Sequence, residues 1–114
     1  MIKIFIAIFT FYFLLINVKA NEFKIEEIFK DFNEPWSMSF INDDNIILTE
    51  KSGKLYSANL KNKKITQIKH NLSILAQGQG GLLDVLYSDD QVYVSYSQNR
   101  GEWKSSTSVA KGKF

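Results

Sequence analysis

The chain has 114 residues, which is the size of one domain, and its 45% hydrophobic and 23% charged content excludes an intrinsically disordered chain. Its 14 basic and 12 acidic residues are not clustered as in a nucleic-acid-binding protein, so we expect no nucleic-acid partner. The absence of cysteine excludes a disulfide scaffold and a thiol nucleophile.

The N-terminal twenty residues have the pattern of a secretory signal peptide. Lys3 gives a short positive region, Ile4–Val18 is almost entirely apolar, and Val18-Lys19-Ala20 resembles a cleavage site. The alternative is an uncleaved membrane anchor, but the apolar run is shorter than the roughly 20 residues of a spanning helix. We therefore expect cleavage after Ala20, a periplasmic or secreted bacterial protein, and no stable membrane insertion of residues 21–114.

The next part of the chain alternates apolar and polar residues, which is typical of half-buried β-strands. The pattern predicts strands at Trp36–Phe40, Ile46–Glu50, Lys54–Leu60 and Ile65–Lys69. Residues that favour turns separate them, at Asn42–Asn45, Ser52-Gly53 and Lys61–Lys64. Short strands joined by hairpins predict an antiparallel meander.

The pattern then begins again, because Phe40–Ile47 and Leu86–Tyr93 match residue type by residue type at an offset of 46 residues. A repeat of this length with about four strands is typical of a β-propeller blade. Further strands are predicted at Gln91–Tyr96 and Thr107–Lys111, with a polar loop at Gln98–Ser105 between them. We expect an all-β chain that comprises one to two blades, and therefore a fragment of a larger propeller.

A glycine-rich segment, Ala76–Val85, lies between the two repeats and carries Gly78, Gly80 and Gly81 within four positions. Glycines allow positive φ angles and close approach of another molecule. The polar amide of Gln79 lies among them, as a side chain that a rigid sheet could present to a ligand. The alternative is that this amide bonds to the backbone of its own loop.

Four segments carry a family resemblance by their order and spacing: Pro35–Phe40, Ile47–Leu55, Gly78–Val85 and Val92–Ser97. Over residues 33–114 the chain resembles the N-terminal part of the soluble aldose dehydrogenases that use pyrroloquinoline quinone (PQQ), the glucose/sorbosone dehydrogenase family. The Gly78–Val85 string is the most specific of the four.

The resemblance implies a six-bladed β-propeller that binds PQQ and Ca²⁺ and oxidises the anomeric carbon of an aldose to a lactone. In that family a histidine on a later blade takes the hydroxyl proton, and calcium polarises the quinone. The catalytic, PQQ-binding and calcium-binding residues correspond to positions beyond Phe114, so no catalytic residue is expected in this chain. Only Gln79 carries over, as a contact to the sugar substrate.

The remaining candidates favour structural roles. We expect His70 to be a surface residue and Asp84 to be structural rather than channel-facing. The pairs Asp43-Asp44 and Asp89-Asp90 are predicted to form turns rather than a calcium site, because they occupy equivalent positions in the repeat.

The two tryptophans are predicted to differ in environment. Trp36 is predicted to pack between blades, while Trp103 lies in a polar loop where exposure is expected. Because fold does not fix function, a non-catalytic propeller used for binding, or a non-functional truncated remnant, remains an alternative to the enzyme.

Overall fold

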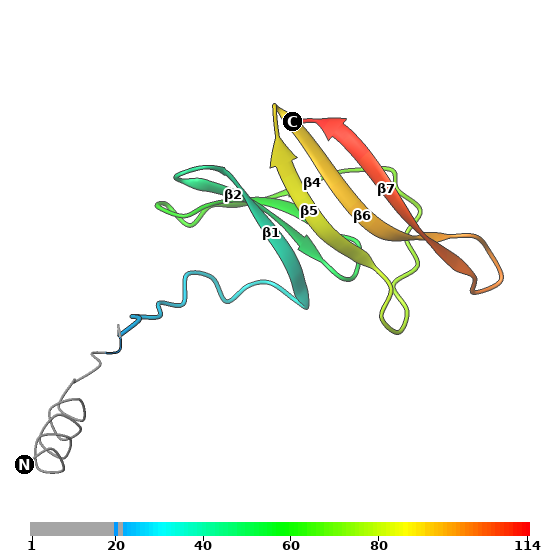
Figure 1. Cartoon of the computed structure of the whole chain (residues 1–114), viewed down its shortest axis with the longest axis horizontal. Coiled ribbons are helices and arrows are strands. Elements are labelled where there is room, and N and C mark those ends of the chain that lie inside the picture. The colour runs from blue at the N-terminus through cyan, green and yellow to red at the C-terminus, as the bar shows by residue number, and fades with distance from the viewer. Residues whose placement is uncertain (1–19, 21) are drawn as a thin grey trace, which may run out of the picture.

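The computed structural model describes residue 20 and residues 22–114, which form two antiparallel β-sheets preceded by an extended segment (Figure 1). The signal peptide expected over residues 1–20 lies outside the described residues, apart from Ala20. Within residues 22–114 we find no helical segment with the length and apolar character that a bilayer crossing requires. The expectation of an all-β chain is confirmed for this part.

The first sheet is a four-stranded meander in the order β1-β2-β3-β4. Its strands are β1 (Pro35–Asn42), β2 (Asn45–Glu50), β3 (Leu55–Asn59) and β4 (Ile65–Ile68). Each neighbouring pair is antiparallel and joined by a short turn, as the alternation of apolar and polar residues predicts.

The second sheet has the order β5-β6-β7, with β5 (Leu82–Ser88), β6 (Gln91–Asn99) and β7 (Ser105–Lys113). The 46-residue repeat is confirmed, because β5 and β6 pair around Ser88 and Gln91 as β1 and β2 pair around Asn42 and Asn45. Both β6 and β7 are longer than predicted, since they stay paired out to Asn99 and Ser105. The two sheets therefore correspond to two propeller blades.

The hydrophobic core lies between the two sheets. It consists of buried side chains from β2, β3, β5 and β6, namely Ile47, Leu55, Leu82, Val85, Val92, Val94 and Tyr96. Ile47 and Leu82 are fully buried, and burying each such side chain stabilises the fold by about 1.5–3 kcal/mol. Polar contacts join the sheets as well, because the Thr49 hydroxyl donates to the Leu83 carbonyl at 2.6 Å.

The extended segment packs on the other face of the first sheet. The Phe32 and Tyr56 rings lie 5.4 Å apart, and the Phe29 ring contacts Phe32. The Asn33 amide donates to the buried carboxylate of Glu50 at 2.7 Å. Sequence reasoning did not anticipate this cover, which buries the side of β2 that faces away from the second sheet.

The turns at equivalent repeat positions differ in detail. At the first, the Asn42 carboxamide oxygen accepts from the backbone amides of Asp44 and Asn45, which is an Asx turn. At the second, Asp89 and Asp90 have φ of 51° and 58°, the conformation of a type I′ hairpin. Both aspartate pairs are thus used in turns, as predicted.

The expected burial of Trp36 is wrong for this chain, in which its side chain is 46% exposed. Trp36, Met38 and Phe40 lie on one side of β1, and this side faces away from the second sheet. A packed neighbour is needed to bury them, and the segment at residues 29–33 covers only part of this face.

Candidate functional site

The glycine-rich loop, residues 76–81, connects the two sheets just before β5, and both its ends are fixed to one residue of β6. The Leu75 amide donates to the Ser97 carbonyl at 2.9 Å, and the Ser97 amide donates to the Gly81 carbonyl at 2.8 Å. Ser97 is itself buried. The loop is therefore a short projection with a rigid base at one end of the second sheet.

Two of its glycines are required by close packing. A Cβ atom at Gly80 would lie 2.8 Å from the Ser97 hydroxyl oxygen, which is tighter than real Cβ contacts. At Gly81, where φ is +155°, a Cβ would overlap the carbonyl of Lys51. The Leu82 amide also donates to the Lys51 carbonyl at 3.2 Å, so the loop is held against the first sheet as well.

Gln79 lies at the exposed tip of this loop. The preceding Gly78 has φ of +56°, and the turn is closed by the Gly80 amide, which donates to the Gln77 carbonyl at 2.8 Å. Backbone groups make these bonds, so the loop is not held together by the Gln79 side chain. A carboxamide has both donors and an acceptor, which suits a ligand rich in hydroxyl groups.

Lys51 is the residue of this region that sequence reasoning missed. Its backbone joins three segments, because its amide donates to the Glu34 carbonyl at 3.1 Å while its carbonyl meets Gly81 and Leu82. Its ammonium group lies 3.8 Å from the Glu34 carboxylate. In the sequence, the only indication of these contacts is that Lys51 lies between the end of the strand at Thr49-Glu50 and the following turn.

The neighbouring Glu50 carboxylate is 2% exposed and is surrounded by donors. Besides the Asn33 amide, the Ser52 and Tyr56 hydroxyls lie 3.4 and 3.5 Å from it, and Lys54 Nζ lies at 3.8 Å. Because a buried charge is costly without such partners, Glu50 is a structural anchor between the extended segment and the β2–β3 hairpin.

Asp84 and His70 also have structural contacts, as predicted. The Ser37 hydroxyl and the Val85 amide donate to the Asp84 carboxylate, which ties β5 to β1. The exposed His70 ring donates from Nε2 to the Gly53 carbonyl at 2.7 Å and accepts at Nδ1 from the Leu72 amide. Neither side chain is directed toward the Gln79 loop by these bonds.

Trp103 and Tyr87 lie near opposite ends of the second sheet, and only Trp103 was a sequence candidate. Trp103 is 80% exposed in the loop between β6 and β7, as its polar surroundings predicted. At the opposite end of the second sheet, the Tyr87 hydroxyl donates to the Asp90 carboxylate at 2.9 Å. This hydrogen bond, together with burial and the negative charge, raises the pKa of Tyr87 above its usual value.

The described residues do not form a PQQ or calcium site. Residues 22–114 contain no group of three histidine, cysteine, aspartate or glutamate side chains that could hold a metal ion. Near the Gln79 loop, the cationic Lys51 is already paired with Glu34. At this end of the sheets the side chain of Gln79 is exposed and offers a hydrogen-bonding carboxamide.

Comparison with known proteins places the chain in a family. The family described as Glucose / Sorbosone dehydrogenase matches residues 32–114. The aldose sugar dehydrogenase YliI of Escherichia coli strain K12 is 28% identical over 95 residues, which are 77% of this chain and 26% of that protein.

Solved structures agree with this assignment. A glucose dehydrogenase is 27% identical with a TM-score of 0.71, over 77% of this chain and 29% of that one. The apo-form soluble aldose sugar dehydrogenase from Escherichia coli is 26% identical with a TM-score of 0.64, over 71% of this chain and 25% of that one. The PQQ-bound aldose sugar dehydrogenase from Streptomyces coelicolor shares the fold, with 15% identity, a TM-score of 0.66 and coverage of 76% and 26%.

The chain thus spans about a quarter of the length of these relatives. The match of the family over residues 32–114 takes in both sheets and the Gln79 loop. We conclude that this chain belongs to the glucose/sorbosone dehydrogenase family.

Proposed function

We propose that this chain is part of an exported bacterial quinoprotein that oxidises the anomeric carbon of an aldose to a lactone, and that Gln79 contacts the sugar. The observation that carries the proposal is the geometry of the Gln79 loop. Its base is fixed to Ser97 and Lys51, while the side chain of Gln79 is exposed at its tip. The name of the YliI relative supports an aldose as the substrate class.

A carboxamide on a loop with a fixed base serves binding rather than bond breaking. It donates from its nitrogen and accepts at its oxygen, so it can hold two hydroxyl groups of a sugar ring in a set orientation. In this proposal PQQ, with Ca²⁺, supplies the hydride acceptor when bound, and other parts of the protein hold both. The role of this chain is to orient the sugar.

The Gln79 assignment is tested by sugar binding to the chain, followed through amide chemical shifts in NMR titrations with aldoses. We expect shifts centred on Gly78–Gly81, and a loss of affinity of about tenfold in Gln79→Ala, the effect of one or two hydrogen bonds. Gln77→Ala is the matched control, since Gln77 is exposed in the same loop and contributes its backbone carbonyl to the turn. Equal losses in both variants would refute the assignment.

The enzymatic part of the proposal is tested separately, by sequencing the transcript past codon 114 and assaying its product for PQQ- and Ca²⁺-dependent dye reduction with aldoses. We expect further blades that include a histidine, and turnover that needs both cofactors. Sugar binding at Gln79 without any turnover would instead support the binding-module alternative.

The export part of the proposal rests on the N-terminal sequence. Expression in a bacterial host and mass measurement of the extracytoplasmic protein should give a chain that begins at Asn21. A protein that keeps Met1 and stays in the cytoplasm would contradict export.

A further inference from the structure

A second projection stands beside the Gln79 loop, and it is the hairpin between β6 and β7. Ser97 of β6 holds both ends of the Gln79 loop, and the strand continues only to Asn99 before the hairpin turns. The Asn99 amide donates to the Ser73 carbonyl at 2.9 Å, so the chain that leads into the loop runs along the stem of the hairpin. With a rise of about 3.3 Å per residue, the two bases are roughly 7 Å apart. In Figure 1 the yellow-green loop before β5 and the orange hairpin leave the same end of the second sheet.

This hairpin reaches further than its equivalent in the first sheet. The β2–β3 ladder ends at Thr49, which corresponds in the repeat to Ser95 of β6, whereas the β6–β7 ladder continues to Asn99. A side-chain bond braces the added length, because Arg100 Nε donates to the Ser106 hydroxyl at 2.8 Å. The extension therefore gives the tip of the hairpin a fixed place beyond the end of the sheet.

The tip is a tight turn in a conformation that its residues do not favour. The Lys104 amide donates to the Gly101 carbonyl at 2.8 Å, and the residues between them, Glu102 and Trp103, have φ of 49° and 62°. Two positive φ angles define a type I′ turn, which favours asparagine, aspartate and glycine because bulky side chains are strained there. The turn at Asp89-Asp90 uses residues that tolerate these angles. The turn conformation therefore gives no reason for a tryptophan at its tip.

Packing within the described residues gives no reason for this tryptophan either. The Trp103 side chain is 80% exposed, and it lies at the tip of a hairpin and not within a strand of either sheet. Leaving the apolar face of an indole in water is unfavourable. Strained residues that persist in a fold are concentrated at binding and active sites. Contact with another molecule accounts for both the strain and the exposure.

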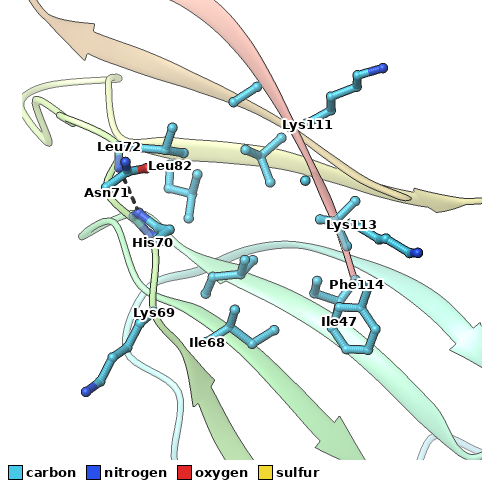
Figure 2. A pocket seen from close by; sticks show the side chains of 15 residues that line it. Ile47, Ile68, Lys69, His70, Asn71, Leu72, Leu82, Lys111, Lys113 and Phe114 are labelled. Atoms are coloured by element: carbon cyan, nitrogen blue, oxygen red, sulfur yellow. Dashed lines mark hydrogen bonds between the residues drawn. The ribbon is translucent and has the colours of Figure 1, made fainter. Parts of the chain in front are cut away.

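The position of Trp103 relative to Gln79 favours a sugar as that molecule. The cleft between the sheets, shown in Figure 2, is lined by core side chains such as Ile47 and Leu82, and neither Gln79 nor Trp103 is part of its lining. Both side chains are exposed at the end of the second sheet. There a carboxamide can bond hydroxyl groups, and an indole can pack on the C–H face of a sugar ring.

The hairpin is displaced from the Gln79 loop across the sheet. The loop leads into β5, while the hairpin joins β6 and β7, the next two strands in the sheet. Because neighbouring strands lie about 4.8 Å apart, this sideways displacement is roughly 5–10 Å. That distance is comparable to the length of one sugar residue. A ring held by Gln79 thus leaves the indole of Trp103 to a second ring attached to it.

We propose that Trp103 stacks on the sugar ring next to the one that Gln79 contacts, so that the protein favours an aldose with a second sugar attached over a single ring. The proposal rests on the sugar-binding function proposed for Gln79. It names the substrate class more closely, as a disaccharide or longer saccharide with a free anomeric carbon. The role of Trp103 is specificity, because the ring that it contacts is not the one that reacts.

Calorimetric titration of the whole exported protein with glucose, maltose, cellobiose and lactose tests this proposal. We expect at least one disaccharide to bind more tightly than glucose, and Trp103→Gly to weaken its binding by about five- to tenfold, the scale of one aromatic contact. Glucose binding should change less than about twofold. Trp103→Phe is the matched control, since it keeps an aromatic face and should keep most of the preference. No preference in the wild type, or equal effects of Trp103→Gly on glucose and disaccharides, would overturn the proposal.

Two further measurements separate this role from others. Glycine adopts positive φ angles freely, so Trp103→Gly should unfold at a urea concentration equal to or above that of the wild type. A lower midpoint would mean that Trp103 packs within the protein, which contradicts the proposal. Gln79→Ala should weaken glucose and disaccharides alike. If it does so while Trp103→Gly weakens neither, this inference fails and the function proposed for Gln79 stands. If Gln79→Ala weakens neither while Trp103→Gly weakens a disaccharide alone, the Trp103 contact stands and the Gln79 assignment fails.

Discussion

The second strand of each sheet has the same place in the repeat, yet β2 and β6 are buried differently. In β2, every residue from Ile46 to Glu50 is buried, whereas burial alternates along most of β6. The reason is that β2 has the second sheet on one face and the Phe32 segment on the other, while β6 has the first sheet on one face alone. Two strands with a similar apolar–polar pattern therefore differ in burial when only one of them is covered on both faces. The neighbouring segments, and not the pattern alone, determine which residues are buried.

The largest expected effect comes from a pair of residues related by the repeat. Ile47 and Tyr93 are 46 residues apart, but the register of the two strand pairs differs by one residue: Ile47 pairs with Ser39 and is fully buried between the sheets, whereas Tyr93 pairs with Leu86. Ile47→Ala should lower the free energy of unfolding by about 3 kcal/mol, because it removes buried methylenes and leaves a cavity. Tyr93→Ala, on the outer face of β6, should cost about 1 kcal/mol or less. Urea unfolding measures both, and similar losses would contradict the one-sided burial of β6.

Much of this fold was predictable because its information is local. Six of the seven strands are predicted from alternation and turn residues, and their observed ends differ from the predicted ends by a few residues at most, as at β6 and β7. The repeat was visible because Asp43-Asp44 and Asp89-Asp90 mark equivalent turns. Cross-strand register then follows from short hairpins, which leave little freedom in pairing.

The rest was not predictable, because it depends on contacts between segments far apart in the chain. Nothing near Lys51 indicates that its carbonyl meets Gly81, and nothing in residues 22–34 indicates that Phe32 packs on Tyr56. The exposure of Trp36 has the same origin, since alternation shows which residues share a face but not what covers that face. The glycines of the Gln79 loop were recognised, but the reason for two of them lies in Lys51 and Ser97.

A second pair of variants compares the two kinds of glycine in the Gln79 loop. Gly81→Ala should destabilise the chain by about 2–3 kcal/mol, because the new Cβ overlaps the Lys51 carbonyl and forces the sheets to shift. Gly78→Ala has open space around its Cβ and a φ of +56°, so only about 1 kcal/mol of backbone strain is expected. Thermal and urea unfolding give the values, and an equal cost would mean that the Gly81 contact does not hold the sheets together.

The cover over β2 can be removed without touching the sheets. Phe32→Ala should cost about 1–2 kcal/mol, since it takes away the ring that packs on Tyr56 and leaves that face of the sheet more exposed to water. Phe23→Ala, at a position 89% exposed, should change stability by less than about 0.5 kcal/mol. Faster amide exchange in β2 of the Phe32 variant, compared with β6, would locate the loss.

The smallest expected effect is on the pH dependence of stability. It distinguishes the turn between β5 and β6 from the equivalent turn between β1 and β2. Tyr87 corresponds to Ile41 in the repeat, and its pKa is raised by the hydrogen bond to Asp90, by burial and by the charge of that carboxylate. A raised pKa means that the unfolded chain loses this proton first, so the contribution of Tyr87 to stability is full below about pH 10 and is lost as pH rises through the folded-state pKa.

Urea unfolding between about pH 9 and pH 11 should therefore show a decline in stability that is smaller in Tyr87→Phe. Asp90→Asn keeps the tyrosine but removes the carboxylate that holds its proton, so it should lessen the decline in the same way. An absorbance titration near 295 nm should find the Tyr87 pKa closer to its usual value in Asp90→Asn. If neither variant changed the alkaline decline, the Tyr87–Asp90 bond would contribute nothing to this turn, and the two hairpins would differ in backbone conformation alone.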